Sequence, residues 1–215
     1  MIKLFSRESL SAAGVRHGPQ GIPVDARLRT NVAHIYAAGD VIGGPQYSHL
    51  AGWQAFQAVR NALLPGAGAG RPRAMPQVCF THPEIAQIGL TEQQARERHG
   101  ERVRTQSVEL AQVDRAVSDD DRLGLIKLVA HANGRLLGAT IMGEHAGEAI
   151  AELGLALSQR LGLRELASAV HPYPTYNSAV QLLATRMALQ GFLTGLRGRL
   201  VRRLARGLAR RSAGP

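Results

Sequence analysis

The pattern of apolar and polar positions predicts short strands and then a helix in the first third of the chain. GIPVDARL (21–28) alternates apolar and polar residues, and IYAA (35–38) is an apolar run that ends at Gly39-Asp40. Both patterns favour β-strands. From Ser48 the apolar spacing changes to three and four, which predicts a helix that ends before Pro65. Its expected buried face consists of Leu50, Trp53, Phe56, Val59 and Leu63.

Residues 77–190 show a mixed pattern that predicts an α+β domain. QVCF (77–80) and IAQIGL (85–90) are short strand candidates. LGLIKLVAH (123–131) and RLLGATIMG (135–143) are apolar runs joined through Asn133-Gly134, a strong sequence signal for a β-hairpin. These segments predict an antiparallel sheet.

Helices are expected between and after these strands. Thr91 with Gln94 three residues later is typical of a helix N-terminal capping box. A helical pattern runs from Ala146 to Leu161, and another helix is expected to start near Asn177 or Ser178, after the break HPYPT (171–175).

A Gly- and Pro-rich segment, PGAGAGRPRAMP (65–76), separates the two halves. No strand precedes its glycines and Pro72 follows them, so it lacks the strand–turn–helix context of a phosphate-binding loop. We interpret it as a linker. The expected organisation is 1–64, linker 65–76, a second domain 77–190 and a tail 191–215.

The charge is concentrated in that tail. The 215 residues include 26 Lys+Arg and 16 Asp+Glu, a net charge of +10, of which seven arginines in 191–215 supply +7. Leucines recur there at three and four, which predicts a basic amphipathic helix. Three interpretations stay open: a terminal helix docked on the body, binding to an anionic membrane surface, and, least favoured, binding to nucleic acid.

The cysteine and histidine content restricts the chemistry. Cys79 is the single cysteine, which excludes an intramolecular disulfide, a Cys-x-x-Cys redox pair and a cysteine-rich zinc site. The eight histidines show no metal-binding spacing; His145 with Glu148 is the nearest approach, and no metal is expected. The N-terminus has no long apolar core of the secretory kind.

Several motifs resemble one family in the same order along the chain. TNVAHIYAAGDV (30–41) resembles the second flavin-binding motif of the pyridine nucleotide-disulfide oxidoreductases, and YSHLAGWQAFQAVRNALLPG (47–66) resembles the helix after it. CFTHPEIAQIGLTEQQAR (79–96) looks like the opening of the family's dimerisation domain. VDRA (113–116), GLIKLV, RLLGATIMGEHAGE and HPYPT then follow in family order. The resemblance is greatest to the mercuric-reductase and dihydrolipoamide-dehydrogenase branches.

The resemblance implies an α+β dimerisation domain, an antiparallel sheet with helices, preceded by the remnant of an α/β flavin-binding domain. It also implies FAD as cofactor. The family's N-terminal Gly-rich flavin motif, redox cysteine pair and NAD(P)H site have no counterpart in this sequence. We therefore expect part of an NAD(P)H-dependent disulfide or mercuric oxidoreductase that is inactive alone. A homodimer is expected, and a companion chain is a candidate source of the N-terminal half.

The family's flavin contacts map onto five residues. Asp40 takes the position of the carboxylate that accepts hydrogen bonds from the ribityl hydroxyls, and Gly39 allows close backbone approach. The backbone near His49, Leu50 and Ala51, at the start of the helix, is expected close to the flavin ring.

The resemblance also assigns a place to Tyr173. Many members carry His-x-His-Pro-Thr-x-x-Glu here, where the second His and the Glu act as acid and base for the partner subunit's dithiol. Tyr173 takes the place of that His and Ser178 that of the Glu. The tyrosine at this place resembles mercuric reductase and its relatives. A phenol, with an ordinary pKa of about 10, exchanges protons poorly at neutral pH. Tyr173 is thus a catalytic candidate at metal-binding thiols, with a purely structural dimer contact as the alternative.

A non-catalytic module is the alternative function: homodimerisation through residues 77–190, or binding to a membrane surface through the tail. A cytoplasmic protein is expected, peripheral to the inner face of a membrane in the second case.

Overall fold

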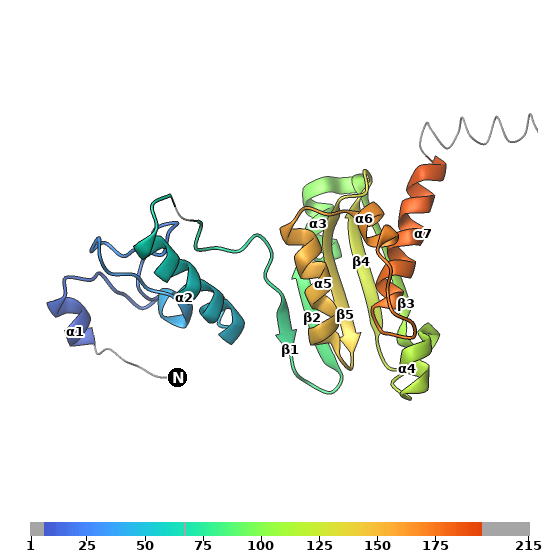
Figure 1. The fold of residues 1–215 in the computed structure, drawn as a ribbon, viewed down its shortest axis with the longest axis horizontal. Coiled ribbons are helices and arrows are strands. Elements are labelled where there is room, and N and C mark those ends of the chain that lie inside the picture. The colour runs from blue at the N-terminus through green and yellow to red at the C-terminus, as the bar shows by residue number, and fades with distance from the viewer. Residues whose placement is uncertain (1–6, 67, 195–215) are drawn as a thin grey trace, which may run out of the picture. The chain divides into compact units, whose positions relative to one another are not determined.

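The computed structural model describes residues 7–66 and 68–194, which divide into two compact units (Figure 1). The first unit ends at Arg73 and the second begins at Ala74. The predicted basic tail (191–215) therefore lies outside the described residues from position 195 on.

The second unit is built on a five-stranded antiparallel sheet in the order β1-β2-β5-β4-β3. The strands are β1 (Gln77–Cys79), β2 (Glu84–Gly89), β3 (Val103–Glu109), β4 (Leu125–His131) and β5 (Leu136–Gly143). The hairpin predicted at Asn133-Gly134 is confirmed, because β4 and β5 pair across it and Gly134 has a φ of +91°. The α+β antiparallel fold predicted for this part of the chain is confirmed.

Helices cover both faces of this sheet. They are α3 (Glu92–His99), α4 (Asp114–Ser118), α5 (Ala146–Ser158), α6 (Leu163–Ser168) and α7 (Ser178–Thr194), with 3-10 turns η2 (Gly100–Arg102) and η3 (Leu110–Gln112). In Figure 1, α5 and α7 lie against one face, α5 on β2 and β5 and α7 on β3 and β4. They form a core with alternate strand residues such as Leu128 and Ile141, whereas α3 packs on the intervening residues Val129 and Leu137. This alternation is the period of two expected of a β-sheet.

The first unit contains α1 (Arg7–Ala12), η1 (Gly39–Ile42) and α2 (Ser48–Leu63). The helix predicted from Ser48 to before Pro65 is confirmed, but the strands predicted at 21–28 and 35–38 are not formed. In their place is an isolated bridge between Arg29, which follows the first segment, and Tyr36, and Ala37 N donates to the carbonyl of Leu28 at 3.0 Å. Isolated strand pairs are marginal without further strands beside them.

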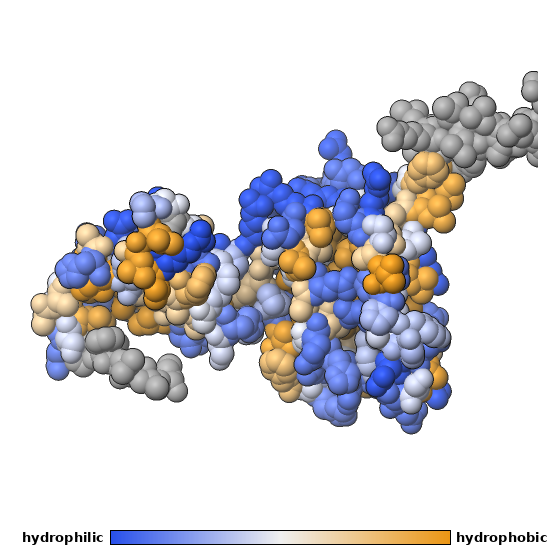
Figure 2. Space-filling model, viewed as in Figure 1, coloured by the Kyte–Doolittle hydropathy of each residue, from blue (hydrophilic) through white to orange (hydrophobic). Residues whose placement is uncertain are grey.

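Helix α2 buries a face that agrees only in part with the one predicted: Leu50 is buried and Trp53 is half-buried. Its inward face carries Gln54 and Gln57, which are buried, beside Leu50 and Ala58. Phe56, Val59 and Leu63, predicted as core, are instead exposed, with 67% of Phe56 and 75% of Leu63 accessible. The pattern of apolar spacing locates the helix correctly but does not say which structure covers its apolar side. Figure 2 shows hydrophobic side chains on the surface of this unit over α2.

None of the helices within residues 7–66 and 68–194 combines the length with the apolar character needed to cross a bilayer.

Candidate functional site

The first candidate site lies where η1 meets α2. Gly39 opens η1 with a φ of +76° and is buried, and its backbone N–H donates to Gln54 Oε1 at 2.8 Å. A Cβ at position 39 would stand 2.9 Å from the Cβ of Ala51. A glycine is thus required here both by backbone conformation and by close packing of η1 on α2.

The predicted flavin contacts are brought together at this junction. Asp40 is exposed directly after Gly39, and its backbone carbonyl accepts from Gly43 N at 3.1 Å. His49 is exposed in the first turn of α2, while Leu50 is buried. The N–H of Ala51 donates to the carbonyl of Tyr47 at 2.9 Å, so this amide is satisfied within the helix. The N-terminal end of α2, with its partial positive charge, therefore lies beside the Asp40 turn.

This arrangement fits one end of a flavin. An exposed carboxylate can accept hydrogen bonds from sugar-alcohol hydroxyls, and a helix N-terminus stabilises negative charge. The role of each of the five residues in binding a flavin stays a prediction.

The second candidate site is the loop between α6 and α7, which contains the predicted Tyr173. The phenol is 74% exposed, and its Oη donates to Asp114 Oδ2 at 2.5 Å. This hydrogen bond and the carboxylate charge raise the pKa of Tyr173 above its ordinary value. Tyr173 is therefore neutral at physiological pH, with a side chain that is largely exposed. Its catalytic role stays a prediction.

Glu152 of α5 holds both ends of this loop. His171 Nε2 lies 2.8 Å from Glu152 Oε1, and Asn177 Nδ2 donates to Glu152 Oε2 at 2.8 Å. The other ring nitrogen of His171 lies 3.1 Å from the carbonyl oxygen of Ala169. The His171 side chain is only 6% exposed and that of Glu152 25%. Sequence reasoning missed Glu152, Asn177 and Asp114, because each lies far in sequence from its partner or reads as an ordinary polar helix residue.

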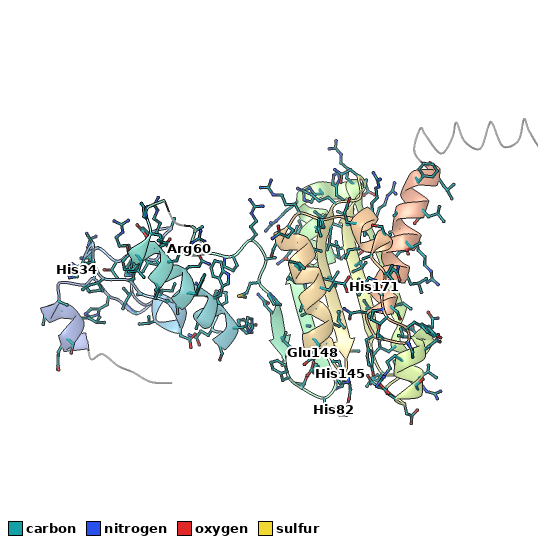
Figure 3. The ribbon with its side chains drawn as sticks, viewed as in Figure 1. His34, Arg60, His82, His145, Glu148 and His171 are labelled. Atoms are coloured by element: carbon teal, nitrogen blue, oxygen red, sulfur yellow. The ribbon has the colours of Figure 1, made fainter. Side chains whose placement is uncertain are left out.

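A pocket of about 380 Å³ opens between α5 and the loop. His145, Glu148, Glu152 and His171 contribute to its wall. Figure 3 shows His145 and Glu148 at the N-terminal end of α5, with His171 higher in the view. Within the described part of the chain, no three His, Cys, Asp or Glu side chains come together in a way that could hold a metal ion.

Tyr176 is the buried aromatic of the same loop. Its Oη lies 3.3 Å from Asp119 Oδ2 and 3.3 Å from Asp121 Oδ2. Burial first, and then these two carboxylates, raise the pKa of Tyr176 well above its ordinary value. This phenol is therefore a structural hydrogen-bond donor between the loop and the Asp119–Asp121 turn.

Curated relatives match the sequence over most of the chain. The mercuric reductase of Shigella flexneri is 38% identical over 180 residues, covering 82% of this chain and 31% of the relative. A dihydrolipoyl dehydrogenase of Staphylococcus aureus is 35% identical over 168 residues, covering 77% and 36%. The chain thus spans about a third of the length of these relatives.

Solved structures agree. LpdA of Mycobacterium tuberculosis superposes with a TM-score of 0.78 at 28% identity, over 86% of this chain and 41% of that one. The HOCl-induced flavoprotein disulfide reductase RclA of Escherichia coli gives 0.75 at 26% identity, over 82% and 41%. The model of the pyridine nucleotide-disulphide oxidoreductase dimerisation domain matches residues 75–184, and the model of pyridine nucleotide-disulphide oxidoreductase matches residues 5–55. The chain belongs to the pyridine nucleotide-disulfide oxidoreductase family.

Proposed function

We propose that this chain forms the C-terminal part of an FAD-dependent NAD(P)H oxidoreductase of the disulfide or mercuric type, and that it does not catalyse the reaction alone. In the complete enzyme two electrons from NAD(P)H reduce a disulfide to two thiols with uptake of one proton, or reduce Hg(II) to Hg(0) with release of one. Bound FAD would relay these electrons. The single cysteine of the chain cannot form the thiol pair that such a reaction uses.

The exposed apolar side chains of α2 are the observation that carries this proposal. A helix in a complete domain turns its apolar face inward, whereas α2 turns Gln54 and Gln57 inward and Phe56, Val59 and Leu63 outward. Both hydrophobic core clusters of the described residues belong to the second unit. The first unit therefore has the arrangement of buried and exposed side chains expected of one part of a larger domain. Further polypeptide of the flavin domain would cover the apolar side chains of α2.

The residues of the first unit support binding one end of FAD. Asp40 would hold the ribityl hydroxyls, and the start of α2, from His49 to Ala51, would face the ring system. The flavin pyrophosphate and NAD(P)H would be held by residues that this sequence does not contain. A companion chain is one source of those residues.

Tyr173 would act on the substrate or its thiol ligands rather than on the flavin. Its donated hydrogen bond to Asp114 leaves the oxygen as an acceptor. Such an atom can accept a hydrogen bond from a thiol or assist a thiol-bound metal ion, but it cannot serve as a proton-transferring base near neutrality. This chemistry favours a mercuric-type acceptor over the acid–base exchange of a His–Glu pair.

A homodimerisation module is the second candidate function. The second unit has its own continuous core, with Leu128, Ile150, Leu153 and Leu183 almost completely buried, and it matches the dimerisation domain. Such a unit can fold and pair without the flavin site. The membrane-surface alternative concerns residues 191–215, which lie outside the described residues from 195 on.

The test compares the purified 215-residue chain with a chimera. In the chimera, the chain replaces the matching C-terminal segment of the Shigella flexneri mercuric reductase. We expect the chain alone to bind no stoichiometric FAD, measured by absorbance near 450 nm, and to show no NADPH oxidation with Hg(II). The chimera should bind FAD and turn over. Stoichiometric flavin with turnover in the chain alone would contradict the proposal, and so would a folded, dimeric chimera that binds no FAD.

Light scattering separates the second candidate from the first. If the 215-residue chain is dimeric and the chimera binds no flavin, the chain acts as a dimerisation module. If the chain stays monomeric at micromolar concentration, it does not act as a dimerisation module.

A further inference from the structure

One carboxylate joins the two ends of the loop that carries Tyr173. Glu152 uses one oxygen for His171, at the start of the loop, and the other for Asn177, at its end. The amide of Asn177 also lies 3.4 Å from the carbonyl oxygen of Ala149, one turn earlier on α5. The loop is thereby attached to α5 at both ends, with five residues between the two attachments.

Internal hydrogen bonds stiffen that short segment. Thr175 Oγ1 donates to the carbonyl of Pro172 at 2.8 Å, and Ser178 Oγ donates to the carbonyl of Thr175 at 2.6 Å. Tyr173 then extends from the segment toward Asp114, the first residue of α4. The Tyr173 ring is thus held at its tip by the Asp114 hydrogen bond, and its loop is held by the Glu152 carboxylate at both ends and by the buried Tyr176 between them.

We propose that Glu152 is a positioning residue for Tyr173, acting through His171 and Asn177. Its place as a positioning residue of the enzyme rests on the proposed function of Tyr173, whereas the order it imposes on the loop does not. A single substitution at position 152 removes the Glu152 hydrogen bonds at both ends of the loop, while the Tyr173 side chain itself is unchanged.

The donor and acceptor pattern around His171 explains why a carboxylate is used. The carbonyl oxygen of Ala169 can only accept a hydrogen bond, and so can an ionised carboxylate. Glu152 faces the His171 ring with one oxygen and the Asn177 amide with the other, so a carboxylate supplies an acceptor oxygen to each end of the loop.

The first experiment uses the 215-residue chain with tyrosine labelled at Cζ, comparing wild type, Glu152→Ala, Glu152→Gln and the control Glu148→Ala. Glu148 lies one turn earlier on α5 and lines the same pocket without joining the loop ends. The Tyr173 signal is assigned by its loss in Tyr173→Phe. In Glu152→Ala we expect the Tyr173 pKa to move down toward its ordinary value of about 10, because the ring leaves Asp114. Exchange of the Ser178 amide, which donates to Thr175 Oγ1 at 3.2 Å, should become about tenfold faster.

Glu148→Ala should leave both readouts as in wild type. Glu152→Gln should give an intermediate result, since an amide retains one acceptor for His171 and loses the charge. Circular dichroism checks that each variant is folded; if Glu152→Ala does not fold, Glu152→Gln and His171→Gln carry the comparison. An unchanged Tyr173 titration with unchanged amide exchange in the folded variants would overturn the proposal.

The second experiment repeats these substitutions in the flavin-binding chimera and measures NADPH-dependent Hg(II) reduction. If Glu152 acts through Tyr173, Glu152→Ala and Tyr173→Phe should each lower kcat by about tenfold, and the double variant should lower it no further. Multiplicative losses would show that Glu152 acts independently of Tyr173. An active chimera in which Tyr173→Phe has no effect refutes the function of Tyr173 and removes the enzymatic role of Glu152, but leaves the loop attachment measured in the first experiment intact.

Discussion

The side-chain carbonyl of Gln54 accepts a hydrogen bond from the backbone N–H of Gly39 at 2.8 Å, and both residues are buried. This contact ties α2 to the turn that carries Asp40. It also explains why a glutamine occupies the inward face of the helix: the buried Gly39 N–H needs an acceptor, and an apolar residue would leave it unpaired.

Gln54→Leu should destabilise the first unit by about 1–3 kcal/mol, the cost of a buried amide without a partner. Trp53 is the single tryptophan of the chain and lies in α2, so urea unfolding followed by its fluorescence reports this unit. Gln93→Leu, on an exposed position of α3 in the other unit, is the matched control and should leave the Trp53 transition unchanged. Equal midpoints for all three proteins would show that the Gln54 contact contributes nothing.

Gly39→Ala tests the close approach of η1 to α2. The added methyl would meet the Ala51 Cβ at 2.9 Å in a backbone with φ of +76°. We expect a loss of about 2–4 kcal/mol, from the left-handed conformation and from overpacking. Adding Ala51→Gly to the Gly39→Ala variant should restore the part of the lost stability that is due to packing. The part that is due to the positive φ should remain lost. If Ala51→Gly restores nothing, packing against Ala51 is not the cause of the loss.

Local sequence signals predicted the second unit well and the first unit partly. The Thr91–Gln94 capping box is confirmed, with Thr91 Oγ1 accepting from Gln94 N at 3.2 Å, and so is the hairpin at Asn133-Gly134. Both signals depend on residues that lie three or fewer positions apart in the sequence. The strand β3 was missed because its central residues are polar and it lies at the sheet edge, where pairing with β4 rather than its own pattern defines it.

The candidate sites show the same division between local and long-range determinants. Gly39, Asp40 and Ala51 were assigned from two motifs that lie close together in the sequence, and the structure brings them together; their role at a flavin stays a prediction. The buried face of α2 was predicted correctly at Leu50 and wrongly at Phe56, Val59 and Leu63, because apolar spacing identifies a helix side without identifying what covers it. Glu152 and Asp114 were missed because their partners lie 25 and 59 residues away; such contacts follow from the tertiary fold alone.

The ion pair between Glu92 of α3 and Lys127 of β4 predicts a pH dependence. Hydrogen bonds from Lys127 first and then Arg96 lower the pKa of Glu92. A lowered folded-state pKa adds stability at pH values above the ordinary glutamate pKa, and this is lost as pH falls through the folded-state value. The contribution is about 1 kcal/mol or less, because the pair is partly exposed.

Glu92→Gln should therefore lower the unfolding free energy at pH 7, and the difference from wild type should shrink below about pH 4.3. Circular dichroism during urea unfolding at several pH values measures it. Glu101→Gln, exposed just after α3, is the control and should leave the wild-type pH profile in place. A Glu92→Gln difference that stays constant down to pH 2 would exclude this linkage.

The exposed apolar face of α2 predicts an effect that depends on context. In the 215-residue chain, Phe56→Ala should change stability by no more than about 0.5 kcal/mol, the usual range for a surface position. In the flavin-binding chimera, where the rest of the flavin domain would cover α2, the same substitution should cost about 3–5 kcal/mol, as for a core phenylalanine.

Leu50→Ala, on the buried side of α2, is the control and should be destabilising in both proteins. Unfolding followed by Trp53 fluorescence gives both values, and equal costs of Phe56→Ala in the two proteins would show that the rest of the flavin domain does not bind this face of α2.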